Sequence, residues 1–213
     1  VGSLPARLND MVGQGPNVRS GGWVVKINFN VMARQLVTLL NFIFAEKEFL
    51  LTKILLLSDT HSFIDETVLK YVRQADQVWH AGDIGDLKVT DTLKKLKPLQ
   101  AVYGNIDSSE ARAEFPLDNR FMCEEVSVWI THIGGYPGKY NPRIREEIRR
   151  DTPRLFITGH SHILKVMPDK KLNLLHMNPG AIGKHGFHQV RTMLRFEISG
   201  REIKNLEVIE LPR

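Results

Sequence analysis

Residues 52–61, TKILLLSDTH, decide the fold of this chain. Ile54 to Leu57 form a short, continuous apolar run, which is typical of a strand that is buried on both faces. The run ends in Ser58 and Asp59, so polar side chains follow directly at the C-terminal end of the strand. In open parallel sheets, functional sites form at this edge. The stretch therefore predicts an α/β fold with a candidate site beside Asp59.

The spacing of apolar residues changes halfway along the rest of the chain. Apolar residues at helical spacing alternate with short apolar runs at first, which predicts a βαβαβ unit, and strand-like stretches dominate afterwards. The predicted helices are 66–74, 88–96 and 142–150. The predicted strands after the first are 77–80, 99–103, 120–123, 126–131, 155–158, 163–167, 172–176, 190–196 and 202–208. A βαβαβ half joined to a strand-rich half indicates a two-sheet α/β sandwich.

The domain organisation follows from length and from the first fifty residues. A chain of 213 residues has room for one domain with a full core. Residues 1–50 are rich in glycine and lack periodicity. They are either an N-terminal extension with a short amphipathic helix near 32–45, or a leader-like segment upstream of the true start. We favour the second account, because the first core strand follows at once, and expect the domain to span residues 51–213.

Composition excludes several classes of protein. The chain is 42% hydrophobic and 25% charged, which is ordinary for a globular protein. Charged residues break the apolar segment 31–51, so no membrane span or export signal is expected. Glutamates interrupt the basic residues of 143–150, which favours a solvated helix face over a nucleic-acid surface. Cys123 is the single cysteine, which suits a protein of the reducing cytoplasm.

Polar residues follow each strand of the predicted parallel unit. Asp59 and His61 are spaced by two after the first strand, so alternation would turn both to one side. Asp83 follows the second strand between two glycines, and Asn105 follows the third. Each of these short motifs alone is weak evidence for a site, because an aspartate at a strand end more often caps a helix or forms a turn. Three successive strand ends nevertheless direct polar groups to one edge.

Histidines follow the later strands in the same way. His132 closes the strand at 126–131, and the Gly-His-Ser-His sequence at 159–162 follows the strand at 155–158. A lone histidine is more often a surface or core residue, but the whole set makes coincidence improbable. The seven candidate metal ligands are Asp59, His61, Asp83, Asn105, His132, His160 and His162. Nitrogen and oxygen donors without a thiolate suit two divalent ions such as Mn²⁺, Fe²⁺, Zn²⁺ or Ni²⁺.

The ordered motifs SDTH, GD, GNID, TH and GHSH resemble those of the calcineurin-like metallophosphoesterase superfamily, over residues 53–210. The short inserts, the WHAGDIGD sequence at 79–86 and the Asn-Pro-Gly at 178–180 resemble its minimal subfamily of small prokaryotic phosphodiesterases. The resemblance implies a four-layer α/β/β/α sandwich of two mixed sheets. It also implies hydrolysis of small phosphodiesters by a hydroxide held between two divalent ions, most often Mn²⁺.

The resemblance assigns roles to individual residues. It places one ion on Asp59, His61, Asp83 and His162, and the other on Asp83, Asn105, His132 and His160. Asp83 would bridge the two ions. Asp83, Asn105 and His132 are the expected catalytic residues together with Asp107, which we expect to orient the ligands.

One position departs from the family pattern. Many members carry a histidine after the Gly-Asn pair, and the minimal subfamily often carries cysteine, but this chain has Ile106. Isoleucine cannot protonate a leaving group, so another residue or a water must do so, or the leaving groups must be acidic. His185 and His188 lie in or beside a glycine-rich loop, where they either contact the substrate or face only solvent. For His80 and His176 we expect packing roles.

Two further functions compete with a small-molecule phosphodiesterase. A protein-binding scaffold could keep the fold, as does the metallophosphoesterase-like subunit of the retromer coat. Ile106 favours this alternative, whereas the complete set of ligand types argues against it. A nuclease ranks lower, because no basic groove interleaved with aromatic residues is evident. Specificity is expected from the loops 108–118 and 134–141, and association into a homo-oligomer is expected only by analogy.

Overall fold

The computed structural model describes residues 18–20, 23–25 and 51–213. The chain divides into two units, residues 1–48 and 49–213. In the first unit, β1 (Val18–Ser20) pairs antiparallel with β2 (Trp23–Val25). The helix expected near 32–45 lies outside the described residues, and the domain start near residue 51 stays a prediction.

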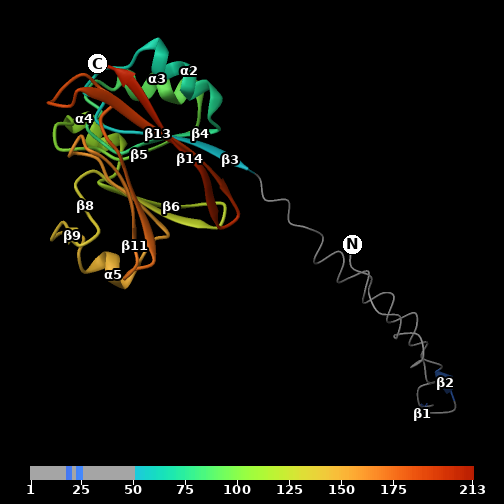
Figure 1. Cartoon of the computed structure of the whole chain (residues 1–213). Coiled ribbons are helices and arrows are strands. Elements are labelled where there is room, and N and C mark those ends of the chain that lie inside the picture. Colours follow the sequence, from blue (N-terminus) through green and yellow to red (C-terminus); the bar gives the residue numbers. More distant parts are fainter. Residues whose placement is uncertain (1–17, 21–22, 26–50) are drawn as a thin grey trace, which may run out of the picture. The chain divides into compact units, whose positions relative to one another are not determined.

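The first sheet of the second unit contains the parallel strands. β3 (Thr52–Leu57), β4 (Gln77–His80) and β5 (Leu99–Ala101) run parallel, so the predicted βαβαβ unit is confirmed. β13 (Val190–Ser199) and β14 (Glu202–Pro212) extend it antiparallel, in the order β14-β13-β3-β4-β5. α2 (Glu66–Gln74) and α3 (Lys88–Leu96) cover its outer face (Figure 1).

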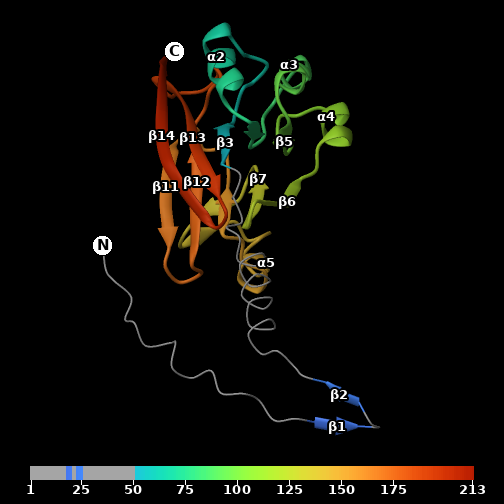
Figure 2. The ribbon, with the colours of Figure 1, turned by 90° about the vertical axis from the view of Figure 1, so that its right-hand side faces the viewer.

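The second sheet faces the first. Its order is β11-β12-β10-β7-β6, and β10 pairs parallel with both of its neighbours. Its strands are β6 (Asp118–Cys123), β7 (Val126–Thr131), β10 (Leu155–Ile157), β11 (Leu164–Asp169) and β12 (Leu174–Pro179). Ile144 lies just before α5 (Glu147–Arg150) and Ile148 lies within it, and both pack on the outer face of this sheet. Figure 1 shows α2 and α3, the two sheets and α5 in succession from top to bottom, and Figure 2 shows β13 beside β14 and β11 beside β12. The expected four-layer sandwich of two mixed sheets is confirmed.

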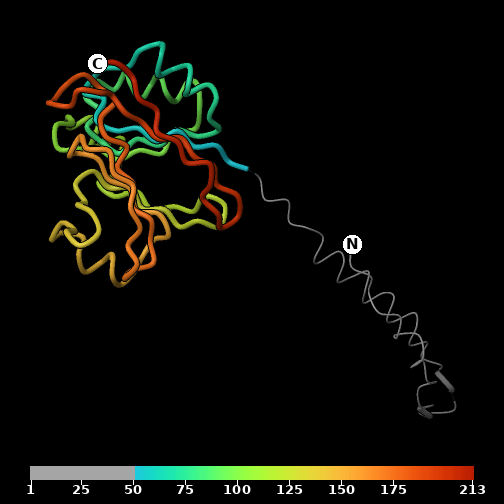
Figure 3. The backbone as a smooth tube through the Cα atoms, viewed as in Figure 1, coloured from blue at the N-terminus to red at the C-terminus, as the bar shows by residue number. Residues whose placement is uncertain are grey.

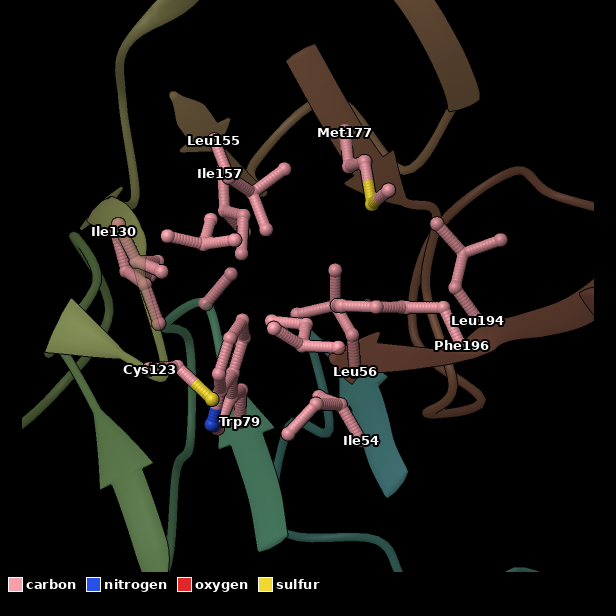
Figure 4. Packing of buried hydrophobic residues seen from close by; sticks show 14 of the residues in the cluster. Ile54, Leu56, Trp79, Cys123, Ile130, Leu155, Ile157, Met177, Leu194 and Phe196 are labelled. Carbon is pink, nitrogen blue, oxygen red and sulfur yellow. The ribbon is translucent and has the colours of Figure 1, made fainter. Parts of the chain in front are cut away.

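The core between the sheets explains the continuous apolar run of β3. Ile54 and Leu56 pack inward with Trp79 of β4 and residues of the second sheet (Figure 4). Leu55 and Leu57 point the other way, into the cluster beneath α2 and α3. Because both faces are covered, every position from 54 to 57 has to be apolar, as the sequence predicted.

Two short elements were not expected, and several boundaries differ from the expectations: β12 and β14 end three and four residues later than predicted. α4 (Ser109–Glu114) and the hairpin of β8 (Gly135–Tyr136) with β9 (Lys139–Tyr140) lie where only loops were expected. The helix predicted at 142–150 is regular only over Glu147–Arg150. The amide of Ile144 bonds to Asn141 O, three residues back, so this segment begins as a tighter turn. The described helices are short, and none is long and apolar enough to cross a membrane.

Candidate metal centre

Two loops beyond the parallel strands form the base of the site. The amide of Asp59 donates to Gly82 O (2.9 Å), and that of His61 donates to Asp83 O (3.1 Å), so backbone pairing continues past β3 and β4. Positive φ angles occur at five candidate ligands: Asp59 (55°), His61 (46°), Asp83 (53°), His160 (68°) and His162 (56°). Residues other than glycine rarely adopt this conformation, and it clusters at functional sites.

The left-handed backbone, rather than strand alternation, turns Asp59 and His61 to one side. Both residues follow the end of β3, so the alternation that the sequence suggested does not apply to them. Thr60, between them, points into the core, where its hydroxyl donates to Ile84 O (2.9 Å) and contacts His80 Nε2 (2.9 Å). The two side chains therefore converge as expected, but for a different physical reason.

Asp59, His61 and His162 form the first group of converging donors, with their ligand atoms within 4.8 Å of one another. His162 Nε2 lies 3.2 Å from Asp59 Oδ1 and 3.3 Å from His61 Nε2. Asp59 is fully buried, yet its Oδ1 accepts no hydrogen bond from any described residue. A buried carboxylate oxygen needs a donor or a positive charge close by, which a protonated His162 or a bound cation would supply.

Asp83, His132 and His160 form the second group. His132 Nε2 lies 3.1 Å from Asp83 Oδ1 and 3.2 Å from Asn105 Oδ1. His132 Nδ1 donates to Ala81 O (2.7 Å), so Nε2 of the neutral ring carries a lone pair. Three lone pairs then meet at one point, which is unfavourable unless His132 is protonated or a cation lies between them.

Asp83 joins the two groups. Its Oδ1 faces His132, and its Oδ2 lies 3.7 Å from His61 Nε2 in the first group. The backbone amide of Ile106 donates to Oδ1 (3.2 Å), while the isoleucine side chain is 46% exposed. One carboxylate thus presents an oxygen to each group, which is the arrangement that a ligand shared by two ions requires.

The carboxylates favour positive charge on one histidine of each group, whereas burial lowers the pKa of His61 and of His160. Burial opposes protonation of His132, but the adjacent Asp83 and Asp59 carboxylates outweigh it and raise its pKa. Contact with Asp59 likewise raises the pKa of His162. Burial works against the charge of Asp83 as well, yet His132 and the Ile106 amide lower the pKa of that carboxyl. Donors about 2.1 Å from one ion lie about 3.0–3.4 Å apart, and the separations of 3.1–3.3 Å within each group fit this range, whereas Asp83 Oδ2 lies somewhat farther (3.7 Å) from His61 Nε2.

Glycines let the ligands approach the backbone. A Cβ at Gly104 would overlap both Oδ1 and the amide nitrogen of Asp83. A Cβ at Gly82 would lie 2.6 Å from His132 Nδ1. Glycine is therefore the residue that allows Asp83 and His132 to lie where they do.

Asp107 and His80 hold the loops of the site by accepting hydrogen bonds from backbone amides. Asp107 is buried and accepts from the amides of Gly85 (2.7 Å) and Gly104 (2.6 Å), so it fastens the two loops that carry Asp83 and Asn105. This contact suits a residue that positions ligands. His80 is fully buried, and its Nδ1 accepts from the Gly82 amide (3.1 Å).

A loop after β12 borders the first group, which the sequence alone left open. The ring centroids of His185 and His61 lie 4.7 Å apart, and those of His188 and His162 lie 5.4 Å apart. Arg213 donates to the carbonyls of Lys184 and Gly186 (both 2.9 Å) and so holds the loop. Figure 3 shows the chain returning along β14 to this end of the molecule. No local sequence signal marks Arg213.

The structure brings all seven predicted ligand side chains together at the C-terminal ends of the strands. Their function as ligands stays a prediction. Two cavities flank the site: one of about 390 Å³ shares His132 and His160, and one of about 300 Å³ shares Asn105 and His132. The loops expected to give specificity contribute Tyr136 to the first and Arg112 to the second.

Comparisons with known proteins identify the family of this chain. The family model of the calcineurin-like phosphoesterase superfamily domain matches residues 52–201. A probable metallophosphoesterase of Methanothermobacter thermautotrophicus is 30% identical over 135 residues, which are 59% of this chain and 74% of that protein.

Solved structures share the fold. Vps29 of Entamoeba histolytica, crystallised with Zn²⁺, has a TM-score of 0.58 at 16% identity, over 75% of this chain and 98% of that chain. A novel archaeal phosphodiesterase has a TM-score of 0.55 at 21% identity, over 75% and 99%. Since the family model spans more than half of the sequence, the chain belongs to the calcineurin-like phosphoesterase superfamily.

Proposed function

We propose that this protein is a metal-dependent phosphodiesterase that hydrolyses small phosphodiesters with the aid of two divalent cations. The observation that carries the proposal is the position of Asp83, whose two carboxylate oxygens face two separate groups of donors. Two cations held about 3.5–4 Å apart are the arrangement that phosphoryl transfer uses.

The ligand assignment follows the two groups. Asp59, His61 and His162 would hold one ion, Asn105, His132 and His160 the other, and Asp83 both. When bound, such ions neutralise the phosphoryl oxygens and lower the pKa of a coordinated water. Mn²⁺ is the cation we expect, with Fe²⁺, Zn²⁺ or Ni²⁺ as substitutes. The Vps29 structure with Zn²⁺ supports divalent-metal binding by this fold.

The residues of this chain contribute orientation and electrostatics. The Ala81 carbonyl fixes the tautomer of His132, leaving Nε2 free to bind an ion. Asp107 holds the loops that carry Asp83 and Asn105. Ile106 supplies only a backbone amide, so this position offers no proton for the leaving group. We therefore expect a preference for substrates whose leaving groups are acidic.

Hydrolysis of bis(p-nitrophenyl) phosphate with Mn²⁺ tests the proposal. Asp83→Ala and His132→Ala should each lower kcat by at least about 100-fold, since loss of a metal removes several kcal/mol of transition-state stabilisation. Asp86→Ala is the matched control, because Asp86 is in the same loop but pairs with the exposed Lys88. Wild-type rates in both Asp83→Ala and His132→Ala would refute the assignment.

A protein-binding scaffold is the second candidate. Ile106 in place of a proton donor and the likeness in fold to Vps29 favour it. A scaffold would give no Mn²⁺-dependent turnover of the activated diester, even when the purified protein contains metal. Measuring metal content and turnover on the same preparation separates the two functions.

A further inference from the structure

The larger of the two cavities beside the metal centre has the features of a ligand subsite. His132 and His160 form one end of it, and the β8–β9 hairpin and the start of β11 form its walls. We call it the hairpin cavity. Its volume of about 390 Å³ falls in the range of small-molecule sites. A phosphoester bound at the second group of ligands would direct one of its ester groups into this space.

Aromatic and aliphatic side chains form the walls of the hairpin cavity, and two of them are held in place. The Lys165 ammonium lies 3.7 Å from the centroid of the Tyr136 ring, a cation–π contact that fixes this ring. The Tyr140 hydroxyl donates to Asp169 (2.7 Å), and its ring packs against Phe156 in the core beside the cavity. Ile163 adds an apolar surface that is 62% exposed. The walls are thus preformed and largely apolar.

Asn178 and Thr158, two buried polar side chains of the cavity, already have partners, whereas His176 Nδ1 has none among the described residues. Asn178 Nδ2 donates to Gly159 O (2.7 Å), and its Oδ1 accepts from the Gly180 amide (3.0 Å). Thr158 Oγ1 pairs with His176 Nε2 (3.0 Å). A sugar would need free donors and acceptors here, whereas an apolar group would not. Asn178 and Thr158 therefore offer little to a sugar.

The charges of the cavity point to an electron-rich ligand. Among the described residues, Lys139 and Lys165 line it and no carboxylate does. Ammonium groups attract both a phosphate and the face of an aromatic ring. An aliphatic chain would gain nothing from these lysines.

We infer that the hairpin cavity binds one ester group of the substrate, that this group is a planar aromatic ring, and that Tyr136 is a specificity-determining residue. The inference rests on the proposed function and names its substrate class: aromatic esters of phosphate. The ring packs against Tyr136 while the phosphate remains at the His132 and His160 end.

Direct binding tests this inference without turnover. The full chain with Mn²⁺ is titrated with phenyl phosphate and with methyl phosphate by calorimetry. Phenyl phosphate should bind about 10- to 100-fold more tightly, as expected from burying an aromatic ring of this size. Tyr136→Ala should reduce this preference to about threefold or less, and Tyr136→Phe should retain it, because the ring rather than the hydroxyl makes the wall.

Tyr103→Ala is the matched control. Tyr103 lines the cavity on the other side of the site, and its ring is also covered by a cation, Arg112 (4.8 Å). This variant should keep the preference for phenyl phosphate. Equal affinities for the two esters, or a preference lost in Tyr103→Ala and kept in Tyr136→Ala, would overturn the inference alone. Failure of both esters to bind would overturn it together with the proposed function.

Discussion

Individual residues set the geometry of the candidate metal centre through their backbone. Asp59, Asp83 and His162 have positive φ, so each side chain leaves the chain in a direction that a strand could not give it. Such conformations cost about 1–3 kcal/mol each and persist only where the surroundings impose them. This free-energy cost indicates that the direction of these side chains matters more here than local backbone stability.

Gly104 gives the sharpest test at this scale. In Gly104→Ala the new Cβ overlaps the Asp83 carboxylate and amide, so Asp83 has to move. We expect hydrolysis of bis(p-nitrophenyl) phosphate to fall about 100-fold, because small displacements of catalytic groups have effects of this size. Metal affinity, measured by calorimetry, should fall with it.

Gly138→Ala is the control for this substitution. Gly138 also has a positive φ (86°), but nothing lies within 4 Å of a Cβ placed there. Its replacement should lower stability slightly and leave metal affinity as in the wild type. Wild-type metal affinity in Gly104→Ala would contradict the importance of the contact with Asp83.

The secondary-structure elements show what sequence patterns can predict. β3 and β4 were predictable, because apolar residues on both faces of a strand leave a strong signal. α4 has only six residues, SEARAE, and the β8–β9 hairpin has two residues in each strand, so neither leaves a readable period. The segment at 142–150 has helical spacing, yet Arg143 is bound to Asp118 and Thr131, and the regular helix begins later.

The start of α2 depends on Asp65. Its Oδ1 accepts from the Val68 amide (3.0 Å), and its Oδ2 pairs with the buried Arg191 (2.9 Å). Asp65→Ala removes the helix cap and leaves Arg191 without this partner, so we expect a loss of about 2–4 kcal/mol in the free energy of unfolding. Urea denaturation measures it.

Ser108→Ala serves for comparison. Ser108 caps α4 through the Ala111 amide and, unlike Asp65, carries no charge to pair with a buried arginine. Ser108→Ala should lower the free energy of unfolding by about 1 kcal/mol, the contribution of a helix cap alone. Equal losses in the two variants would mean that the ion pair contributes nothing.

At the scale of the whole molecule, buried histidines couple stability to pH. Burial lowers the pKa of His80 and of His176 from 6.5 to about 4. Between these values the unfolded chain binds more protons than the folded one, so stability present above pH 6.5 is lost as the pH falls towards 4. Each histidine contributes up to roughly 3 kcal/mol, from about 1.4 kcal/mol for each pKa unit.

His176→Gln tests this coupling. The wild type should be more stable at pH 7, and its advantage in unfolding free energy should shrink as the pH is lowered to 4.5, since glutamine does not titrate. Chemical denaturation at several pH values, with a chelator present, measures the difference. A constant difference across this range would show that His176 is not kept neutral by folding.

The assembly of the site was predictable only in part. The ligands follow strand ends, and the rule that parallel strands gather their C-terminal ends groups Asp83 with Asn105. The loop held by Arg213 and the wall formed by Tyr136 depend on contacts between distant segments, which leave no local pattern. The candidate ligand positions could therefore be read from the sequence, whereas the positions that we propose to choose the substrate required the fold.

Anomalous diffraction from crystals grown with Mn²⁺ tests the central claim most directly. We predict two peaks in each molecule, about 3.5–4 Å apart, one on either side of Asp83. The first peak should lie among Asp59, His61 and His162, and the second should contact His132 and His160. A single peak, or two peaks that do not share Asp83, would contradict the account.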